Sequence, residues 1–421
     1  MANPGERQIL IFWRHPAHRL EETIEKVRRR FEVNHAVYLR WTRERIVDNF
    51  QRFYAMIPDH AYKKYTEAGA APFLFLLVTD HNPVYRYRIA GGSGFKKVNV
   101  NSFDLKQELR KQGGTSLHAT NNEREFRRDL MYLTGQPAHE FNPPQWDGKI
   151  DSIKEIHQDI VAAEGWKDLR QVFAVLNEAV DYVVLRNFTK LPDEHIHGNH
   201  GDIDLLVEDS DAHNRAASIL NKERRAHTMV GGRKVYVDFR SVEDFYYDPQ
   251  WCRDILKNKI MVRGFYAPDP ENHFFSLLYH GHVQKPKISK DYIPKLMELA
   301  QEIGLDWITE EWLKDPDKAA ILLDDWLKGK GYYLTRPNGC PQYSPEFVVK
   351  VPNAPFLYQS ASNFYREVMA ANGANGSAQD LLEQIRQYEA NFMSRRFLWR
   401  AFINRMKAYP RDLWQRRLMK S

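Results

Sequence analysis

Three aspartates on two short apolar segments are the residues of this chain best suited to chemistry. Asp202 and Asp204 alternate with apolar residues in segment 201–207 (GDIDLLV), and Asp238 lies within segment 235–239 (VYVDF). Strand side chains alternate between faces, so Asp202 and Asp204 are expected on one face. If the two strands are neighbours, three carboxylates converge and repel one another unless a divalent cation lies among them. Such oxygen ligands suit Mg²⁺ or Mn²⁺, and this kind of site can bind a nucleoside triphosphate for nucleotidyl or phosphoryl transfer.

Residues 180–240 resemble the core of the nucleotidyltransferase superfamily, which has the DNA polymerase β-like fold. The resemblance rests on an Asp-x-Asp pair within an apolar strand and one further acid in a later strand. It implies that Asp202 and Asp204 bind the metal and that Asp238 completes the site or acts as base toward an acceptor hydroxyl. The alternative is that the two aspartates lie on the solvent face of an ordinary strand.

The first motif of that superfamily usually carries Gly-Gly or Gly-Ser, which cradles the phosphates. This chain has Arg186 and Asn187 at the corresponding place. Arg186 can replace the backbone donors by binding phosphate through two hydrogen bonds. The exchange equally fits a changed donor substrate or a lost activity.

Histidines gather in two further segments. Residues 195–200 (HIHGNH) fit zinc ligands, a loop that contacts substrate or a plain exposed loop. In segment 273–282, His273 and His280 share a helical face, and lysines follow it. His280 and Lys285 are therefore candidates for binding the acceptor or a phosphate, and a core helix with a solvated basic end is the alternative.

The strand and helix order of residues 8–135 distantly resembles nucleoside diphosphate kinases. The resemblance rests on segment 71–74 (APFL) before a central strand and on segment 116–123 (SLHATNNE) entering a helix. It implies that His118 accepts or relays a phosphoryl group and that Arg88 contacts phosphate. The Gly-Ser-Asp that follows the histidine in that family is Ala-Thr-Asn here, so the fold can be retained without the kinase activity. Otherwise His118 helps to cap the following helix or is simply exposed.

Helices and strands must position these candidate residues, and the hydrophobic periodicity of the sequence predicts where those helices and strands lie. Strands are expected at 8–13, 36–41, 72–79 and 84–89, besides the two acidic ones. Helices are expected at 20–31, 42–57, 123–133, 151–163, 166–179, 211–222 (with Asp211 as a cap), 271–302 (interrupted near 285–287) and 310–328.

The predicted fold class is α+β. A ferredoxin-like, nucleoside diphosphate kinase-like domain is expected at 1–137 and a linker at 138–154. A nucleotidyltransferase-fold domain follows at 155–262, a mainly helical extension at 263–352 and a helical basic tail at 353–421.

The composition of the chain indicates the cellular compartment that we expect for the protein. The chain has 421 residues, 43% of them hydrophobic, and its two cysteines are too few for a disulfide framework, which predicts a reducing, cytoplasmic compartment. Neither a signal peptide nor an apolar run of about 18 residues is evident, so no transmembrane helix is expected. The net charge of +6 comes from residues 394–421, which hold nine Lys or Arg and one Asp.

Segment 395–420 interleaves basic residues with Trp, Phe, Leu and Met at helical spacing. A basic amphipathic helix with tryptophans is typical of an anionic membrane surface. Binding to nucleic acid and packing on the body of the protein are the alternatives.

Together these patterns predict a Mg²⁺-dependent nucleotidyl- or phosphoryl-transferase at the cytoplasmic face of a membrane. Its donor is expected to be a nucleoside triphosphate or nucleotide sugar, and its acceptor a sugar phosphate or polyol of surface polysaccharide assembly. An RNA-directed nucleotidyltransferase and a non-catalytic nucleotide-binding protein are the rivals.

Overall fold

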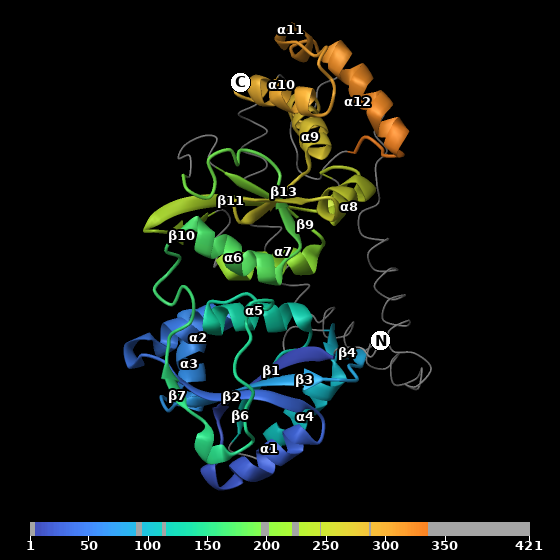
Figure 1. Ribbon diagram of the computed structural model, residues 1–421. Helices are drawn as coiled ribbons and strands as arrows, with labels where there is room; N and C mark the ends of the chain where they lie inside the picture. Colours follow the sequence, from blue (N-terminus) through green and yellow to red (C-terminus); the bar gives the residue numbers. More distant parts are fainter. Residues whose placement is uncertain are drawn as a thin grey trace, which may run out of the picture. The chain divides into compact units, whose positions relative to one another are not determined.

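The computed structural model describes residues 5–89, 95–111, 115–194, 202–220, 227–244, 246–285 and 288–335. The predicted membrane tail and the histidine-rich segment 195–200 therefore lie outside the described residues. The chain divides into two compact units, residues 1–83 with 101–360 and residues 84–100 with 361–421. Helices combined with mixed sheets confirm the predicted α+β class (Figure 1).

The first sheet has the strand order β6-β1-β3-β2-β7. All pairs are antiparallel except β2–β7. Its strands are β1 (Glu6–Arg14), β2 (Glu32–Arg40), β3 (Phe73–Asp80), β6 (Ser116–Ala119) and β7 (Glu155–His157). Every residue of the central strand β3 is buried, because helices cover both faces of the sheet.

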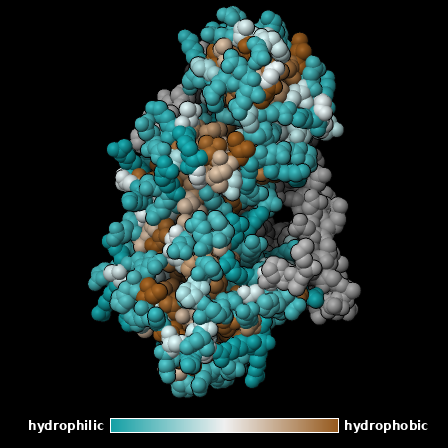
Figure 2. Space-filling view, in the orientation of Figure 1, coloured by the Kyte–Doolittle hydropathy of each residue, from teal (hydrophilic) through white to brown (hydrophobic). Residues whose placement is uncertain are grey.

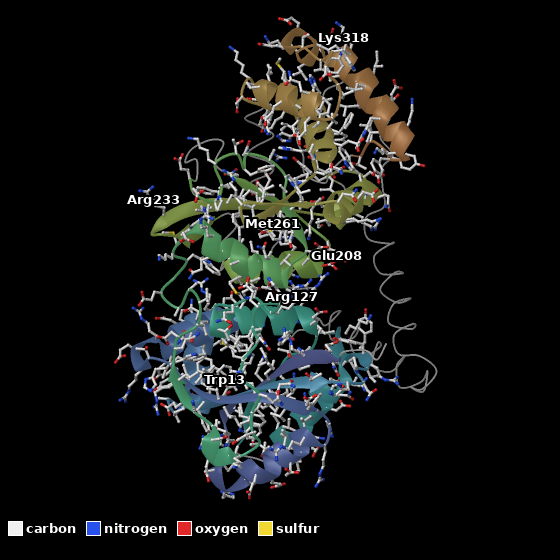
Figure 3. All side chains as sticks on the ribbon, viewed as in Figure 1. Trp13, Arg127, Glu208, Arg233, Met261 and Lys318 are labelled. Atoms are coloured by element: carbon white, nitrogen blue, oxygen red, sulfur yellow. The ribbon has the colours of Figure 1, made fainter. Side chains whose placement is uncertain are left out.

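The faces of this sheet enter different apolar clusters. Ile9 and Ile11 of β1 pack with residues of α2, α3 and α5, whereas Leu10 and Phe12 pack with residues of α1 and α4. Trp13, labelled in Figure 3, belongs to the first of these clusters. The helices are α1 (Leu20–Arg28), α2 (Ile46–Tyr54), α3 (Pro58–Ala68), α4 (Val100–Lys111) and α5 (Glu123–Thr134), with short 3-10 turns at Ala17–Arg19, Arg43–Arg45 and Ile150–Ser152.

Two sequence expectations fail in this region. Residues 151–163 were expected to be helical, but residues 155–157 form β7, which pairs in parallel with β2 and closes the edge of the first sheet. The isoleucines of this segment have helical spacing, and pairing with β2 overrides that local pattern. Helices α3 and α4 were not expected at all. The predicted linker runs without helix or strand up to residue 149, and the backbone N–H of Trp146 donates to the Asn34 carbonyl oxygen (2.8 Å).

The second sheet has the order β10-β11-β9-β8. Its strands are β8 (Tyr182–Val184), β9 (Ile203–Val207), β10 (His227–Val230) and β11 (Arg233–Ser241). Strands β9 and β11 are parallel, and the other pairs are antiparallel. Helices α6 (Leu169–Ala179) and α7 (Ser210–Leu220) cover one face, as Figure 1 shows.

The opposite face of this sheet meets a helical subdomain. Leu206 and Val183 pack there with Trp251, Phe274 and Leu277. The subdomain contains the 3-10 turn Val242–Asp244, α8 (Pro249–Lys257), α9 (Pro270–His282), α10 (Tyr292–Glu302), α11 (Glu310–Leu313) and α12 (Pro316–Lys330). The hairpin of β12 (Ile260–Val262) and β13 (Phe265–Ala267) instead packs beside β8 and α6, and its Phe265 belongs to the cluster on the α6 face. The expected break between residues 271 and 302 is confirmed as the gap between α9 and α10.

Aspartates begin many of these helices. Asp168, Asp248, Asp269 and Asp315 each accept a hydrogen bond from a backbone N–H of the first turn, and the last three precede a proline. At α7 the Asp209 carboxylate accepts from the Ala212 N–H (2.7 Å), so the predicted capping residue Asp211 is corrected by two positions.

The two sheets of the first unit share one apolar cluster, which contains Ile9 as well as Val237. Helix α5 packs against α6, and Arg127 of α5 lies 2.9 Å from Glu178 of α6 (Figure 3). On the face shown in Figure 2, apolar side chains are scattered among hydrophilic ones in the coloured part of the surface. No described helix is long and apolar enough to cross a bilayer.

The second unit contributes one described element pair, the antiparallel hairpin of β4 (Tyr85–Ile89) and β5 (Phe95–Asn99). Arg88 lies on β4, and its Nη1 donates to the Tyr87 carbonyl oxygen (3.2 Å).

Candidate functional site

The two acidic segments are neighbouring strands, as expected. Asp238 of β11 lies directly beside Asp204 of β9 in the parallel register. Ile203 and Leu205 point into the core under α6 and α7, so Asp204 and Asp202 belong to the opposite face. The fold therefore places the three predicted carboxylates on one face of the second sheet.

These carboxylates differ in exposure. Asp202 and Asp238 are exposed, whereas Asp204 is 5% exposed. Arg186, which follows β8, donates from Nη2 to Asp204 Oδ1 at 2.9 Å, and both side chains are buried. Burial raises the pKa of Asp204, the charge of Arg186 opposes the rise, and the charges of Asp238 and Asp202 add to it. Arg186 thus faces the aspartates, and its counter-ion is a carboxylate of the predicted metal site.

A second arginine and a tyrosine extend this face. Arg240 lies two residues after Asp238 on β11, and its guanidinium carbon is 4.3 Å from the centroid of the Tyr246 ring. The guanidinium carbon of Arg186 lies 5.7 Å from the same ring. Arg186 Nη1 and Arg240 Nε are both buried, and neither has a hydrogen-bond partner among the residues that the structure describes. Sequence analysis did not single out Arg240 or Tyr246, although the alternation Asp238, Arg240 along a strand could have indicated the arginine.

Asn187 follows Arg186 in the left-handed region, with φ at 60°. This conformation is uncommon for residues other than glycine, and asparagine tolerates it best. The chain turns sharply here, so Asn187 shapes the turn that carries Arg186.

His280 lies behind Tyr246. Its Nδ1 is 3.0 Å from the Tyr246 hydroxyl and 2.8 Å from Gln284 Oε1. Burial, together with the charge of Arg186, lowers the pKa of His280 to about 2, so its imidazole is neutral. His280 is 5% exposed, whereas the neighbouring predicted residue Lys285 is exposed.

The other histidines of α9 are core residues. His273 packs against the Phe188 ring with centroids 4.7 Å apart, and burial lowers its pKa to about 3. His282 Nε2 lies 2.9 Å from the Leu313 carbonyl oxygen. This arrangement matches the alternative of a core helix for most of the segment.

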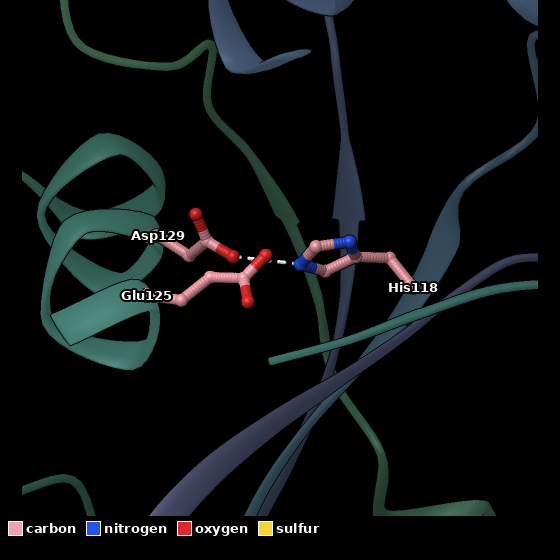
Figure 4. A group of neighbouring side chains, drawn as sticks. All are labelled: His118, Glu125 and Asp129. Carbon is pink, nitrogen blue, oxygen red and sulfur yellow. Dashed lines mark hydrogen bonds and ion pairs between the residues drawn. The ribbon is translucent and has the colours of Figure 1, made fainter. Parts of the chain in front are cut away.

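A tighter cluster of potential ligands lies in the first sheet. Among the described residues, three ligand atoms come within 4.8 Å of one another only at His118, Glu125 and Asp129 (Figure 4). The three aspartates of the second sheet are spaced more widely than that.

Internal partners already occupy the His118 cluster. His118 Nε2 is 2.6 Å from Asp129 Oδ2, and Arg128 donates to Asp129 Oδ1 at 2.6 Å. Burial alone would raise the pKa of Asp129, but the charges of Arg128 and His118 hold it below its usual value. Glu125 accepts from the Asn121 backbone N–H at 2.8 Å. The cluster therefore orients His118 without needing a metal ion.

Three cations surround β6 near His118. Lys64 of α3 donates to Ser116 Oγ (3.0 Å), Lys106 of α4 to Asn121 Oδ1 (3.3 Å) and Arg110 of α4 to the Leu117 carbonyl oxygen (2.7 Å). Burial lowers the pKa of both lysines, and the charge of Arg110 lowers it further. Sequence reasoning missed all three, because α3 and α4 were not expected. Arg88, the predicted phosphate contact, belongs to the second unit, so its pairing with His118 stays a prediction.

Comparisons with protein-family models, with curated proteins and with solved structures found no match to this chain.

Proposed function

We propose that the chain is a divalent-cation-dependent nucleotidyl- or phosphoryl-transferase that works on the aspartate-bearing face of β9 and β11. The observation that carries the proposal is the register of two parallel strands, which sets Asp238 beside Asp204 on the face that Asp202 shares. This arrangement supports the resemblance to a nucleotidyltransferase core. The order β6-β1-β3-β2 in the first sheet supports the ferredoxin-like assignment of the N-terminal domain.

The residues present fit a hard divalent cation, because two exposed carboxylates flank a third. Asp202 and Asp238 would hold Mg²⁺ or Mn²⁺ together with Asp204. The cation would neutralise the donor's phosphates and polarise the phosphoryl group that is transferred.

The chain's own side chains carry the remaining steps. Arg186 and Arg240 bind the anionic donor, since each has a buried nitrogen that no described residue hydrogen-bonds. Asp238 is exposed and accepts the proton of the acceptor hydroxyl. The helical subdomain excludes water behind Tyr246 and His280, so charges on this face interact more strongly than in bulk water.

We assign the donor to nucleoside triphosphates or nucleotide sugars and the acceptor to sugar phosphates or polyols. The acceptor class rests on the sequence of segment 395–420, which suits an anionic membrane surface where surface polysaccharides are assembled. Flotation with anionic liposomes is expected to retain the full chain. Retention on RNA that weakens steeply with salt would instead favour the RNA-directed alternative.

The test is a thermal-shift screen of nucleoside triphosphates and nucleotide sugars, with and without Mg²⁺. A ligand that binds only the folded chain stabilises it by mass action. The wild type is compared with Asp202→Asn/Asp238→Asn, whose exposed side chains can change without breaking the buried pair. Asp151→Asn/Asp306→Asn is the control at exposed aspartates elsewhere.

A Mg²⁺-dependent shift that only the first variant loses is expected. A shift that survives in this variant and requires His118 would move the nucleotide site to the first sheet. Binding without any product, under every metal tried, would favour the non-catalytic alternative.

A second candidate function concerns His118, which we propose as a phosphate-binding or phosphoryl-accepting residue. Its orientation by Asp129 and the three surrounding cations favour it. Incubation with a nucleoside triphosphate labelled at its γ-phosphate is expected to give an acid-labile label that His118→Asn lacks. If Lys106→Gln/Arg110→Gln binds inorganic phosphate as the wild type does, the assignment fails.

A further inference from the structure

We propose that Arg186 stands in for one of two metal ions, so that the aspartate face of β9 and β11 holds a single divalent cation. This inference rests on the proposed function, because it assumes that these carboxylates bind a metal. It concerns what the departure from Gly-Gly or Gly-Ser at positions 186 and 187 does to the site.

The position of Arg186 carries the first step. In a two-metal site the ions lie about 3.5–4 Å apart and are clamped by shared oxygens. Asp204 is the central carboxylate, with Asp202 before it on β9 and Asp238 beside it on β11. Its Oδ1 accepts from Arg186 Nη2 at 2.9 Å, and the two side chains are only 9% and 7% exposed. A second cation at that oxygen would lie in contact with a buried guanidinium, and the two positive charges would repel each other. Asp204 Oδ1 is therefore not available as a ligand for a second metal ion.

Charge balance carries the second step. Three carboxylates with two divalent cations carry one net positive charge. The same charge results from three carboxylates, two guanidinium groups and one divalent cation. Arg186 and Arg240, which approach the Tyr246 ring from 5.7 Å and 4.3 Å, are those two groups. The two guanidinium groups thus supply the charge of one divalent ion, and Arg240 also faces Asp244, whose Oδ2 lies 4.0 Å from its Nη1.

A buried donor without a partner carries the third step. Arg186 is 8% exposed, and within the described part of the chain its Nη1 has no hydrogen-bond partner. Buried N–H groups are nearly always paired in folded proteins, because leaving one unpaired destabilises the folded state. A donor phosphate oxygen would satisfy Nη1 while Nη2 stays on Asp204. Arg186 would then join a carboxylate to a phosphate, as a bridging metal ion does.

The test counts coupled manganese ions in the full-length chain by electron paramagnetic resonance. Mn²⁺ is added together with methylene-bridged analogues of the four ribonucleoside triphosphates, because the second ion of a two-metal site can require the nucleotide. Two Mn²⁺ ions at the separation of a two-metal site broaden each other's spectrum, whereas an isolated ion does not. The signal of Asp202→Asn/Asp238→Asn gives the background of ions bound elsewhere.

The wild type is expected to bind one carboxylate-dependent Mn²⁺ per chain with no spin–spin coupling. Arg186→Lys keeps the charge and should behave alike, whereas Arg186→Met should gain a second, coupled ion. Circular dichroism checks that each variant is folded. If Arg186→Met does not fold, the wild type and Arg186→Lys still decide the count.

Two coupled ions in the wild type would overturn the inference and leave the proposed function standing. An Arg186→Met variant that folds and binds a single uncoupled ion would also overturn it. If no Mn²⁺ bound beyond the background in any variant, the proposed function itself would fail.

Discussion

Arg186 and Asp204 form the most consequential pair of side chains in the candidate site. Both are buried, and a buried ion pair is stable only while each charge keeps its partner. Asp204→Asn or Arg186→Met should therefore destabilise the chain by about 3–5 kcal/mol, since either leaves an uncompensated buried charge. The double variant should lose much less than the sum of the two. Urea unfolding of all four chains measures this coupling, and additive losses would show that the pair is not a unit.

His280 gives the chain a predictable response to acid. Burial and the charge of Arg186 lower its pKa to about 2 from an ordinary value of 6.5. The unfolded chain takes up a proton below pH 6.5 and the folded chain does not. The neutral, buried His280 therefore contributes fully to the free energy of unfolding above pH 6.5. This contribution is lost as the pH falls below 6.5, by about 1.4 kcal/mol per pH unit.

Replacing His280 by glutamine should flatten the fall in unfolding free energy between pH 6.5 and about pH 5. His139→Gln, at an exposed position, should leave the fall unchanged. The measurement is urea unfolding across this pH range. Equal slopes for the wild type and His280→Gln would mean that His280 is protonated within the folded chain.

The residues of the site differ in how far the sequence predicts them. Asp202 and Asp204 are predictable, because alternation along a strand fixes their common face. Asp238 joins them only because β9 and β11 pair, which the sequence leaves as a condition. The bond from Arg186 to Asp204 is not, since it depends on the antiparallel register of β8 and β9, which the Leu185 N–H extends by donating to the Asp204 carbonyl oxygen (2.9 Å). The cations around His118 come from helices that lie far from it in sequence, so no local sequence pattern predicts them.

Helix caps are the features that position the elements around the site. Helix α6 supports the sheet on the face opposite the aspartates, and Asp168 begins it by accepting from the Gln171 N–H at 2.8 Å. Asp168→Ala should cost about 1 kcal/mol, because a first-turn N–H loses its partner. Asp306→Ala is the control at an exposed residue outside helices. Urea unfolding compares the two, and an equal loss in both would mean that the cap does not stabilise α6.

At the scale of elements, long periodic segments are predictable and short paired ones are not. The apolar run at β3 and the amphipathic helices α1 and α5 lie close to where periodicity places them. Strand β7 has three residues, all exposed, and it forms because its backbone pairs with the free edge of β2. Three residues hold no alternation long enough to outweigh the helical spacing of Ile153, Ile156 and Ile160 in the surrounding segment.

At the scale of the whole molecule, the two sheets of the first unit share an apolar cluster. The pair between Arg127 and Glu178 joins α5 to α6, which the sequence assigns to different domains. We therefore expect the two sheets to unfold together. Tryptophan fluorescence and far-ultraviolet circular dichroism in urea should give coincident transitions, and two separated transitions would show that each sheet is stable without the other.

The central claim is that the aspartate face of β9 and β11 binds a divalent cation and a nucleotide. A crystal structure of the full chain grown with Mn²⁺ and a methylene-bridged triphosphate tests it most directly, because anomalous scattering locates manganese. The account predicts an anomalous peak at Asp202 and Asp238, with a phosphate oxygen at Arg186 Nη1. A peak at His118, Glu125 and Asp129 alone, or a nucleotide bound away from Arg186, would contradict it.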